Sequence, residues 1–195
     1  GSRLTVMGVD PGLTRCGVGI VRGGVGTPLE LLGVGVIRTP SDLDHGARLL
    51  RIHDGLEEWF DAHHPDAMAV ERVFAQHNRS TVAGTAQAMG LTQMIGARHG
   101  VAVGVHTPSE VKAAISGSGR ADKAQVGLMV ARVLHLEKPP TPADAADALA
   151  LAITHIWRGG TQSRIEAAMA VHQHSPARTW RQRSAPRTRQ EHHLR

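Results

Sequence analysis

The chain has 195 residues and a net charge of +5, and its length suits one well-buried domain with a further segment beyond it. A single cysteine, Cys16, excludes an intramolecular disulfide framework and is typical of a reducing compartment. No apolar run approaches the roughly 20 residues that cross a bilayer and no signal peptide is visible, so we expect a cytoplasmic protein without membrane association.

The positive charge is concentrated toward the C-terminus. Through Trp157 the chain carries 14 Lys and Arg against 15 Asp and Glu, whereas eight Arg and two Glu follow from Arg158 onward. This last segment is also rich in His, Gln, Ser and Pro and lacks apolar periodicity, as disordered segments do. We therefore predict a folded domain over residues 1–158 and a basic, disordered tail over residues 159–195. The composition leaves open whether the tail attracts phosphates or is a plain solvated terminus.

Three strands are predicted at the start of the chain. Residues 4–10 form an apolar run that ends at Asp-Pro-Gly, a turn signal. Residues 15–22 and 29–38 are rich in Val, Ile, Leu and Gly, and the Gly-rich stretch between them suits a hairpin connection. We therefore expect these three strands to pair as antiparallel neighbours.

Helices and two further strands make up the rest of the predicted domain. Residues 42–63 carry apolar side chains at helical spacing with charges between them. The remaining predicted elements are a buried strand at 67–71, a helix at 81–99, a strand at 101–105, short helices at 109–115 and 122–134, and a last helix at 142–157. This order predicts an α/β fold with a five-stranded mixed sheet flanked by helices, although periodicity alone does not distinguish among such folds.

Four carboxylates stand where the predicted elements would deliver them to one place. Asp10 ends the first strand and Glu71 ends the fourth, and each follows an apolar run, so each should emerge at the end of a buried strand. Asp144 and Asp147 are three residues apart on the last helix, which places them on one face about 5–6 Å apart at Cβ. The alanines around them are small, as a helix closely apposed to a sheet requires.

This set of acids suits the hydrolysis of a phosphodiester. The reaction needs an activated water and stabilisation of charge on the entering and leaving oxygens, and two divalent ions about 3.5–4 Å apart supply both. Carboxylate oxygens are the ligands that Mg²⁺ prefers, and without a metal the four acids would repel one another. We therefore predict a site for two Mg²⁺ ions, in which Mn²⁺ can substitute.

Taken singly, three of the acids have ordinary structural explanations. Asp10 before Pro-Gly suits an Asx turn, Asp144 suits the first turn of a helix, and Glu71 could pair with an arginine. Asp147 is harder to explain in this way because it lies within an apolar helix face.

Together these segments resemble the RuvC family of Holliday junction resolvases. The matching pieces are residues 8–12, 70–74, 111–112, 117–123 and 143–150, and they follow the family's order. The block Asp-Ala-Ala-Asp-Ala-Leu-Ala at residues 144–150, with two acids upstream, is the most specific of them. The resemblance implies a ribonuclease H-like fold and a homodimer that resolves four-way DNA junctions by paired symmetric nicks during recombination and repair. It also implies a branch-migration helicase complex as a partner.

The resemblance assigns metal-binding catalytic roles to four acids, Asp10, Glu71, Asp144 and Asp147. Lys112 and Lys123 match lysines that the family uses near the scissile phosphate or the DNA backbone. Phe74 matches an aromatic residue beside the junction centre, where it can stack on an unpaired base. Arg72 stands where the family commonly has an uncharged polar residue, and we expect it to contact phosphate or a carboxylate.

Three other features leave alternatives open. The Gly-rich loop at residues 116–123 opens a helix and is expected to offer free backbone N–H groups to a phosphate, but Lys123 could also be an ordinary surface lysine. The small residues of the helix at 81–99 permit close approach to the sheet or to a second subunit, and the resemblance favours the subunit. His155 could act at the edge of a metal site, although a packed helix histidine is the favoured interpretation.

Rival functions remain at this point. An actin- or sugar-kinase-type ATPase can also end its first strand in Gly-x-Asp-x-Gly, but such folds need two similar halves, and this chain is too short. A nuclease of the same fold could act on another nucleic acid, such as an RNA–DNA hybrid. A junction-binding module without catalysis would favour lysines where this chain has four acids.

Overall fold

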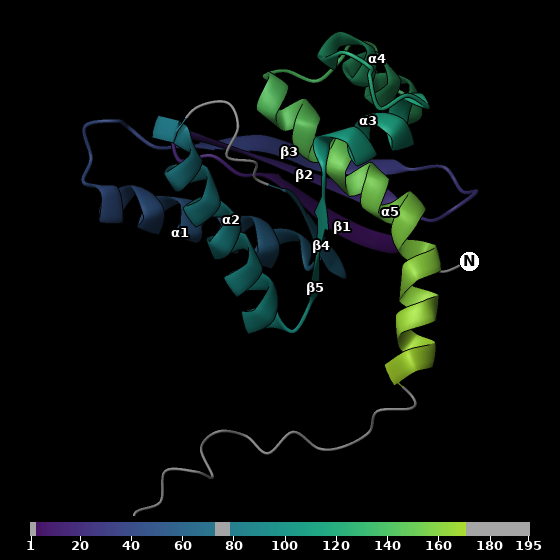
Figure 1. The fold of residues 1–195 in the computed structure, drawn as a ribbon, viewed down its shortest axis with the longest axis horizontal. Helices are drawn as coiled ribbons and strands as arrows, with labels where there is room; N and C mark the ends of the chain where they lie inside the picture. Colours follow the sequence, from purple (N-terminus) through teal and green to yellow (C-terminus); the bar gives the residue numbers. More distant parts are fainter. Residues whose placement is uncertain (1–2, 73–78, 171–195) are drawn as a thin grey trace, which may run out of the picture. The chain divides into compact units, whose positions relative to one another are not determined.

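The computed structural model of the protein describes residues 3–72 and 79–170. In chain order its elements are β1 (Leu4–Asp10), β2 (Arg15–Gly23), β3 (Glu30–Arg38), α1 (His45–His63), β4 (Ala67–Glu71), α2 (Arg79–His99), β5 (Ala102–His106), α3 (Pro108–Ser116), α4 (Lys123–Val133) and α5 (Ala143–Ala170). Figure 1 follows them along the chain. Each strand and helix that the sequence predicts is present, and the end of the last helix differs most from the prediction.

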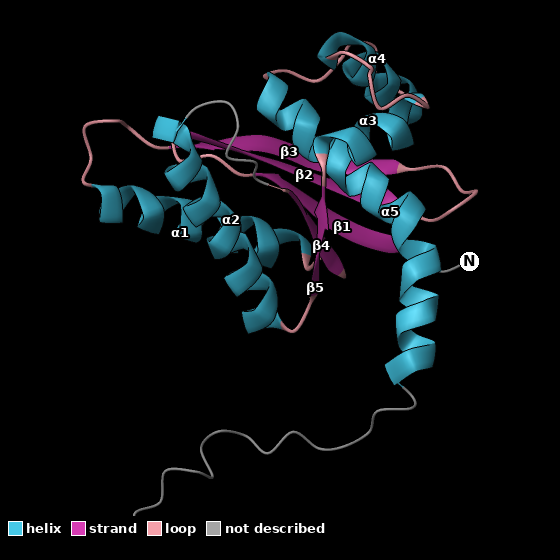
Figure 2. Ribbon diagram, viewed as in Figure 1, coloured by secondary structure: helices cyan, strands magenta, loops and turns pink. Residues whose placement is uncertain are grey.

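The five strands form one mixed sheet in the order β3-β2-β1-β4-β5. β1 pairs with β2 and β2 with β3 in antiparallel fashion, as the hairpin signals predict, whereas β1–β4 and β4–β5 are parallel (Figure 2). Parallel neighbours need a crossover connection, and α1 and α2 supply the two crossovers. The predicted α/β fold with a five-stranded mixed sheet flanked by helices is therefore confirmed.

Helices cover both faces of the sheet. α1 and α2 pack on one face over a core that includes Met7, and α5 packs on the other with α3 and α4 over a core that includes Val6 and Leu149. Successive side chains of a strand point to opposite faces. Gly8 and Asp10 therefore share the α5 face of the sheet with Val6.

Main-chain atoms of α5 lie directly against the sheet. A Cβ atom added to Gly8 would overlap the carbonyl oxygen of Ala148, and one added to Gly17 would overlap the carbonyl oxygen of Asp144. These glycines of β1 and β2 let the helix approach as closely as its alanine-rich sequence predicts. The same contacts fix the height of α5 above the strands.

α5 continues to Ala170, whereas the sequence predicts a helix that ends near Trp157. The prediction rested on the loss of apolar periodicity, but periodicity reports burial, and a helix can extend beyond the residues that it buries, as the exposed Met169 shows. By its internal contacts the chain divides into two units, residues 1–161 and 162–195. Most of the predicted tail lies outside the described residues, so its disorder stays a prediction. None of the described helices combines the length and apolar character needed to cross a membrane.

Gly17→Ala should lower the free energy of unfolding by about 1–3 kcal/mol or more, because the added methyl group meets a main-chain oxygen that cannot rotate away. Urea unfolding followed by circular dichroism measures the change. The control is Gly46→Ala in α1, where an added Cβ meets open space and the stability should stay equal or rise by up to about 1 kcal/mol. Equal stability of the two variants would contradict the close packing of α5.

Candidate active site

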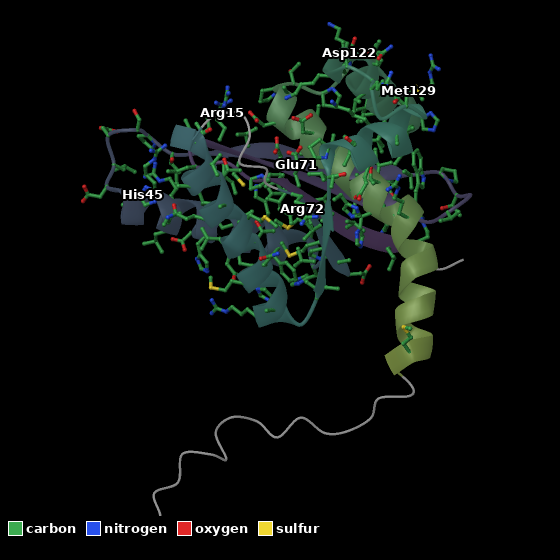
Figure 3. All side chains as sticks on the ribbon, in the orientation of Figure 1. Arg15, His45, Glu71, Arg72, Asp122 and Met129 are labelled. Atoms are coloured by element: carbon green, nitrogen blue, oxygen red, sulfur yellow. The ribbon has the colours of Figure 1, made fainter. Side chains whose placement is uncertain are left out.

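Two acids leave adjacent strands side by side on the α5 face of the sheet. β1 and β4 are parallel neighbours with Val9 opposite Val70, so Asp10 and Glu71 are the next residues of the pair. The alternation of side chains along each strand directs both carboxyl groups toward α5. Both residues are partly buried, and Figure 3 labels Glu71.

The other two acids stand in the first turns of α5. Asp144 and Asp147 are three residues apart and therefore lie on one face of the helix. Gly17 is the sheet partner of Asp10, and the carbonyl of Asp144 packs on that same glycine. This contact holds the acidic face of α5 over the end of β1.

All four acids line one cavity of about 440 Å³. Both predicted lysines line it as well, Lys112 from α3 and Lys123 from the first position of α4. The other described residues around it are Pro108, Val111, Val126, Ala150 and Leu151. Six charged groups from five elements thus converge between apolar walls, which is the usual form of a binding or catalytic site.

The two strand-end acids hold protons more tightly than isolated carboxyl groups do. Burial is the largest cause of the raised pKa of Asp10, and the charges of Glu71, Asp147 and Asp144 raise it further. Burial also raises the pKa of Glu71, although a hydrogen bond with Asp10 and the charges of two lysines act in the opposite direction. The site therefore concentrates more negative charge than its surroundings compensate.

Each acid of α5 has a basic partner. Lys123 Nζ lies 3.4 Å from Asp147 Oδ2, and Arg15 Nε lies 3.3 Å from Asp144 Oδ2. The charge of Asp147 is the largest cause of the raised pKa of Lys123. Both basic side chains are more than half exposed, so the pairs are weak and the partners can exchange for other charged groups.

The two lysines stand on helices whose first turns are capped. α3 begins with a capping box between Thr107 and Glu110, and α4 begins with one between Asp122 and Gln125. A capping box satisfies backbone N–H groups at the start of a helix and fixes where the chain enters it. These caps place both lysine-bearing helices beside the cavity.

Three backbone N–H groups of the loop at residues 116–123 are not free, although the sequence predicts that this loop offers free N–H groups. The N–H of Ser118 donates to Ser116 Oγ, the N–H of Arg120 donates to Ser118 Oγ, and the N–H of Ala121 donates to the Ser118 carbonyl. The prediction was wrong for these groups, because the serines of the loop satisfy them locally.

A family model described as Crossover junction endodeoxyribonuclease RuvC matches residues 6–155. The chain belongs to the RuvC family. Proteins of that name from Cutibacterium acnes and Streptomyces avermitilis are 76% and 61% identical to it over 166 and 169 residues. The first comparison covers 85% of this chain and 85% of the relative, and the second covers 87% and 96%.

Solved RuvC structures share the fold. Thermus thermophilus RuvC in complex with a Holliday junction substrate superposes with a TM-score of 0.77 at 33% identity, covering 82% of this chain and 97% of that one. The yeast mitochondrial Holliday junction resolvase gives a TM-score of 0.54 at 13% identity over 85% of each chain, which supports the fold alone. The ribonuclease H-like fold implied by the resemblance is confirmed.

The other two expected DNA-binding residues are Arg72 and Phe74. Arg72 is exposed, is not among the described lining residues, and donates its backbone N–H to the His106 carbonyl at 2.8 Å. Figure 3 labels it close to Glu71. Phe74 lies in residues 73–78, outside the described part of the chain, so its stacking role stays a prediction.

His155 packs beside the site rather than in it. Its Nδ1 lies 3.0 Å from His106 Nε2, and its ring contacts the backbone position of Gly104. Burial, with a smaller effect of His106, lowers the pKa of His155 to about 4. This geometry supports the interpretation of His155 as a neutral, packed helix histidine rather than as a residue at the edge of a metal site.

Sequence reasoning missed the ion pair between Arg15 and Asp144. Arg15 begins β2 only five residues after Asp10, but its role depends on the antiparallel register, which a single sequence does not supply. Gly17 was missed for the same reason. A detectable signal was the repeated glycine on alternate positions of β2, which indicates a surface open to a close neighbour.

The RuvC family implies a divalent metal, and the four acids fit one by their chemistry. They offer hard oxygen ligands, and the pKa of Asp10 is raised first by burial and then by neighbouring carboxylates whose charge a cation would offset. Among the described residues, three ligand atoms come within 4.8 Å of one another only at Glu57, Asp61 and His99 of α1 and α2. The four acids are therefore spread more widely than the ligands of a closed single-ion site.

The cluster on α1 and α2 is explained by ion pairs. Glu57 lies 2.6 Å from His99 Nε2, 3.7 Å from Arg98 Nη1 and 3.8 Å from His53 Nε2. The His99 ring is also stacked on Phe60, with centroids 4.0 Å apart. Basic groups thus already surround the carboxylate that would have to bind a cation.

Asp10→Asn should stabilise the metal-free protein at pH 8 and leave it nearly unchanged at pH 4. Because the pKa of Asp10 is raised in the folded state, its contribution to stability is present at low pH and is lost as the pH rises through the folded pKa. A neutral amide avoids that loss, and each kcal/mol should raise Tm by about 2–4 °C. Thermal unfolding in EDTA measures this, and a lower Tm of the variant at pH 8 would contradict the crowding of charge.

Proposed function

We propose that this protein is a Mg²⁺-dependent endodeoxyribonuclease that resolves four-way (Holliday) DNA junctions by paired symmetric nicks during recombination and repair. The names of its curated relatives support the reaction, and the Thermus RuvC complex with a Holliday junction substrate supports the DNA substrate. The observation that carries the proposal is the convergence of four acids and two lysines on one cavity in a RuvC-family chain.

The four acids would hold two Mg²⁺ ions, with Mn²⁺ able to substitute. Bound divalent ions supply an activated water and offset charge on the entering and leaving oxygens. Asp10 and Glu71 come from buried strands, so they act as rigid ligands, whereas Asp144 and Asp147 approach from the helix above them. Ligands from the sheet and from α5 would thus surround a phosphodiester bound in the cavity that they line.

Lys112 and Lys123 would orient the scissile phosphate. Each projects from a capped helix into the cavity that the acids line, and neither is a ligand for a divalent cation. Lys123 is already attracted by Asp147, so its ammonium group lies where a phosphate oxygen would enter the acid cluster. The lysines thus compensate the phosphate charge while the carboxylates bind metal.

The wider assembly follows from the family. A homodimer would present two such cavities to one junction, which accounts for paired nicks, and a branch-migration helicase complex would deliver the DNA. Phe74 would stack on an unpaired base at the junction centre, and Arg72, exposed at the end of β4, would contact a phosphate. We expect the protein to act in recombination and repair on chromosomal DNA in the cytoplasm.

The rival within the same fold is a nuclease with another substrate. Purified protein with Mg²⁺ should nick a synthetic four-way junction symmetrically in two strands and leave linear duplex and RNA–DNA hybrid largely intact. Equal cleavage of all three substrates would overturn the junction assignment. Cleavage in excess EDTA would overturn the metal-dependent mechanism.

Asp147→Asn should retain junction binding and reduce cleavage by several orders of magnitude, because an amide is a weaker metal ligand than a carboxylate. Gel-shift binding in EDTA and single-turnover cleavage in Mg²⁺ separate the two effects. Asp61→Asn on α1, outside the cavity, serves as the matched control and should cut normally. Normal nicking by the Asp147 variant would remove this residue from the metal site.

Lys123→Ala should slow single-turnover cleavage by about 10²-fold, the usual cost of losing one group that stabilises a transition-state charge. Junction affinity should change far less. The control is Lys138→Ala, an exposed lysine outside the lining of the cavity. Equal cleavage rates for the two variants would exclude Lys123 from the reaction.

A further inference from the structure

A second and larger cavity of about 1220 Å³ opens beside the acidic one. It lies where the β1–β2 turn, the β3–α1 connection and the start of α2 meet. Its basic lining residues are Arg15, Arg38, His45, Arg48 and Arg51, and Asp144 is the only acid among the described residues that line it. The body of the chain is nearly neutral, so this concentration of positive charge is local.

The basic side chains come from two directions. Arg15 and Arg38 are directly opposite each other on the antiparallel strands β2 and β3, an arrangement of like charges that costs stability. His45, Arg48 and Arg51 follow one another at intervals of three along α1 and share one helix face. The wall of the cavity is therefore basic on both its sheet side and its helix side.

The guanidinium group of Arg48 is held in place by neutral oxygens. Its Nε donates to Thr39 Oγ1 at 3.0 Å and its Nη2 to Thr14 Oγ1 at 2.9 Å. The buried Thr39 is itself fixed through a hydrogen bond to the Leu13 carbonyl at 2.6 Å. Within the described residues no carboxylate lies at ion-pair distance from Arg38, Arg48 or Arg51, so their charges are not cancelled inside the protein.

The basic cavity adjoins the acidic one at Asp144. Asp144 lines both, and Arg15, which pairs with Asp144, lines the basic one. A nucleic-acid strand with its reacting phosphate among the four acids would therefore meet the arginines at its next phosphates. Arginine recognises phosphate through paired donors, and several adjacent phosphates would balance the four arginines.

We propose that this basic cavity binds the phosphodiester backbone of the junction DNA on one side of the cleaved phosphate. Arg38, Arg48 and Arg51 hold consecutive backbone phosphates. Arg15 lies where the basic cavity meets the acidic one, beside Asp144. The inference rests on the proposed function, and it adds a binding site that is distinct from the four acids and the two lysines of the acidic cavity.

Salt dependence of binding tests the proposal, because each lost phosphate contact lowers the slope of log K against log salt by about 0.9. A labelled four-way junction is titrated in EDTA at salt concentrations from about 50 to 200 mM with the wild type, Arg38→Ala, Arg51→Ala and the double variant. The matched control is Arg3→Ala, an exposed arginine at the opposite end of β1 from Asp10.

Each single variant should reduce the slope by about one and the double variant by about two, whereas Arg3→Ala should leave it unchanged. The loss of affinity between the lowest and the highest salt concentration should therefore be about threefold smaller for each lost contact. Arg38→Lys should restore most of the slope.

An unchanged slope in the double variant, with wild-type binding intact, would overturn the basic cavity as a backbone site. A loss of slope that Arg3→Ala shares equally would also overturn it, because the effect would then be one of net charge. Failure of the wild type itself to bind or cut the junction would instead end the proposed function. The two failures are thus distinguishable in one set of titrations.

Discussion

The contact between the main chain of α5 and two strand glycines is the constraint on which the site depends. Gly8 and Gly17 leave room for the carbonyl oxygens of Ala148 and Asp144, so the helix lies directly on β1 and β2. The acidic face of the helix is thereby held over strand-end acids that could not move toward it. At these two glycines the nearest atoms of the helix belong to its main chain, so the contact does not depend on the choice of a rotamer.

Charge compensation follows the same geometry. The acids that emerge from the buried strands have raised pKa values, first because of burial and then because of neighbouring carboxylates. The acids on the helix meet flexible basic groups, Lys123 and Arg15, from neighbouring elements. A rigid, buried pair of acids beneath an adaptable, ion-paired one is an arrangement in which cations can enter without distorting the fold.

The elements and the four acids could be predicted because local patterns carry them. Strand-end acids follow apolar runs, and the spacing of Asp144 and Asp147 reports a helix face directly. The packing of α5 on β2 and the register between β2 and β3 leave no local signal, so the Arg15–Asp144 pair and the basic cavity could not be predicted. The prediction of free N–H groups was wrong for Ser118 and Arg120, since composition does not show which serine accepts a hydrogen bond from which N–H group. The far end of α5 was also missed, because its last residues are not on an apolar face.

Asp144 lines both cavities, whereas Asp147 lines the acidic cavity alone, so a substitution of Asp144 affects two sites. Removing its carboxylate takes away an oxygen donor on one side and unpairs Arg15 on the other. The two aspartates occupy one helix face, yet they are not interchangeable. A genetic screen would therefore find that different second-site substitutions rescue variants of Asp144 and of Asp147. Only Asp144 lines both the acidic cavity and the basic cavity.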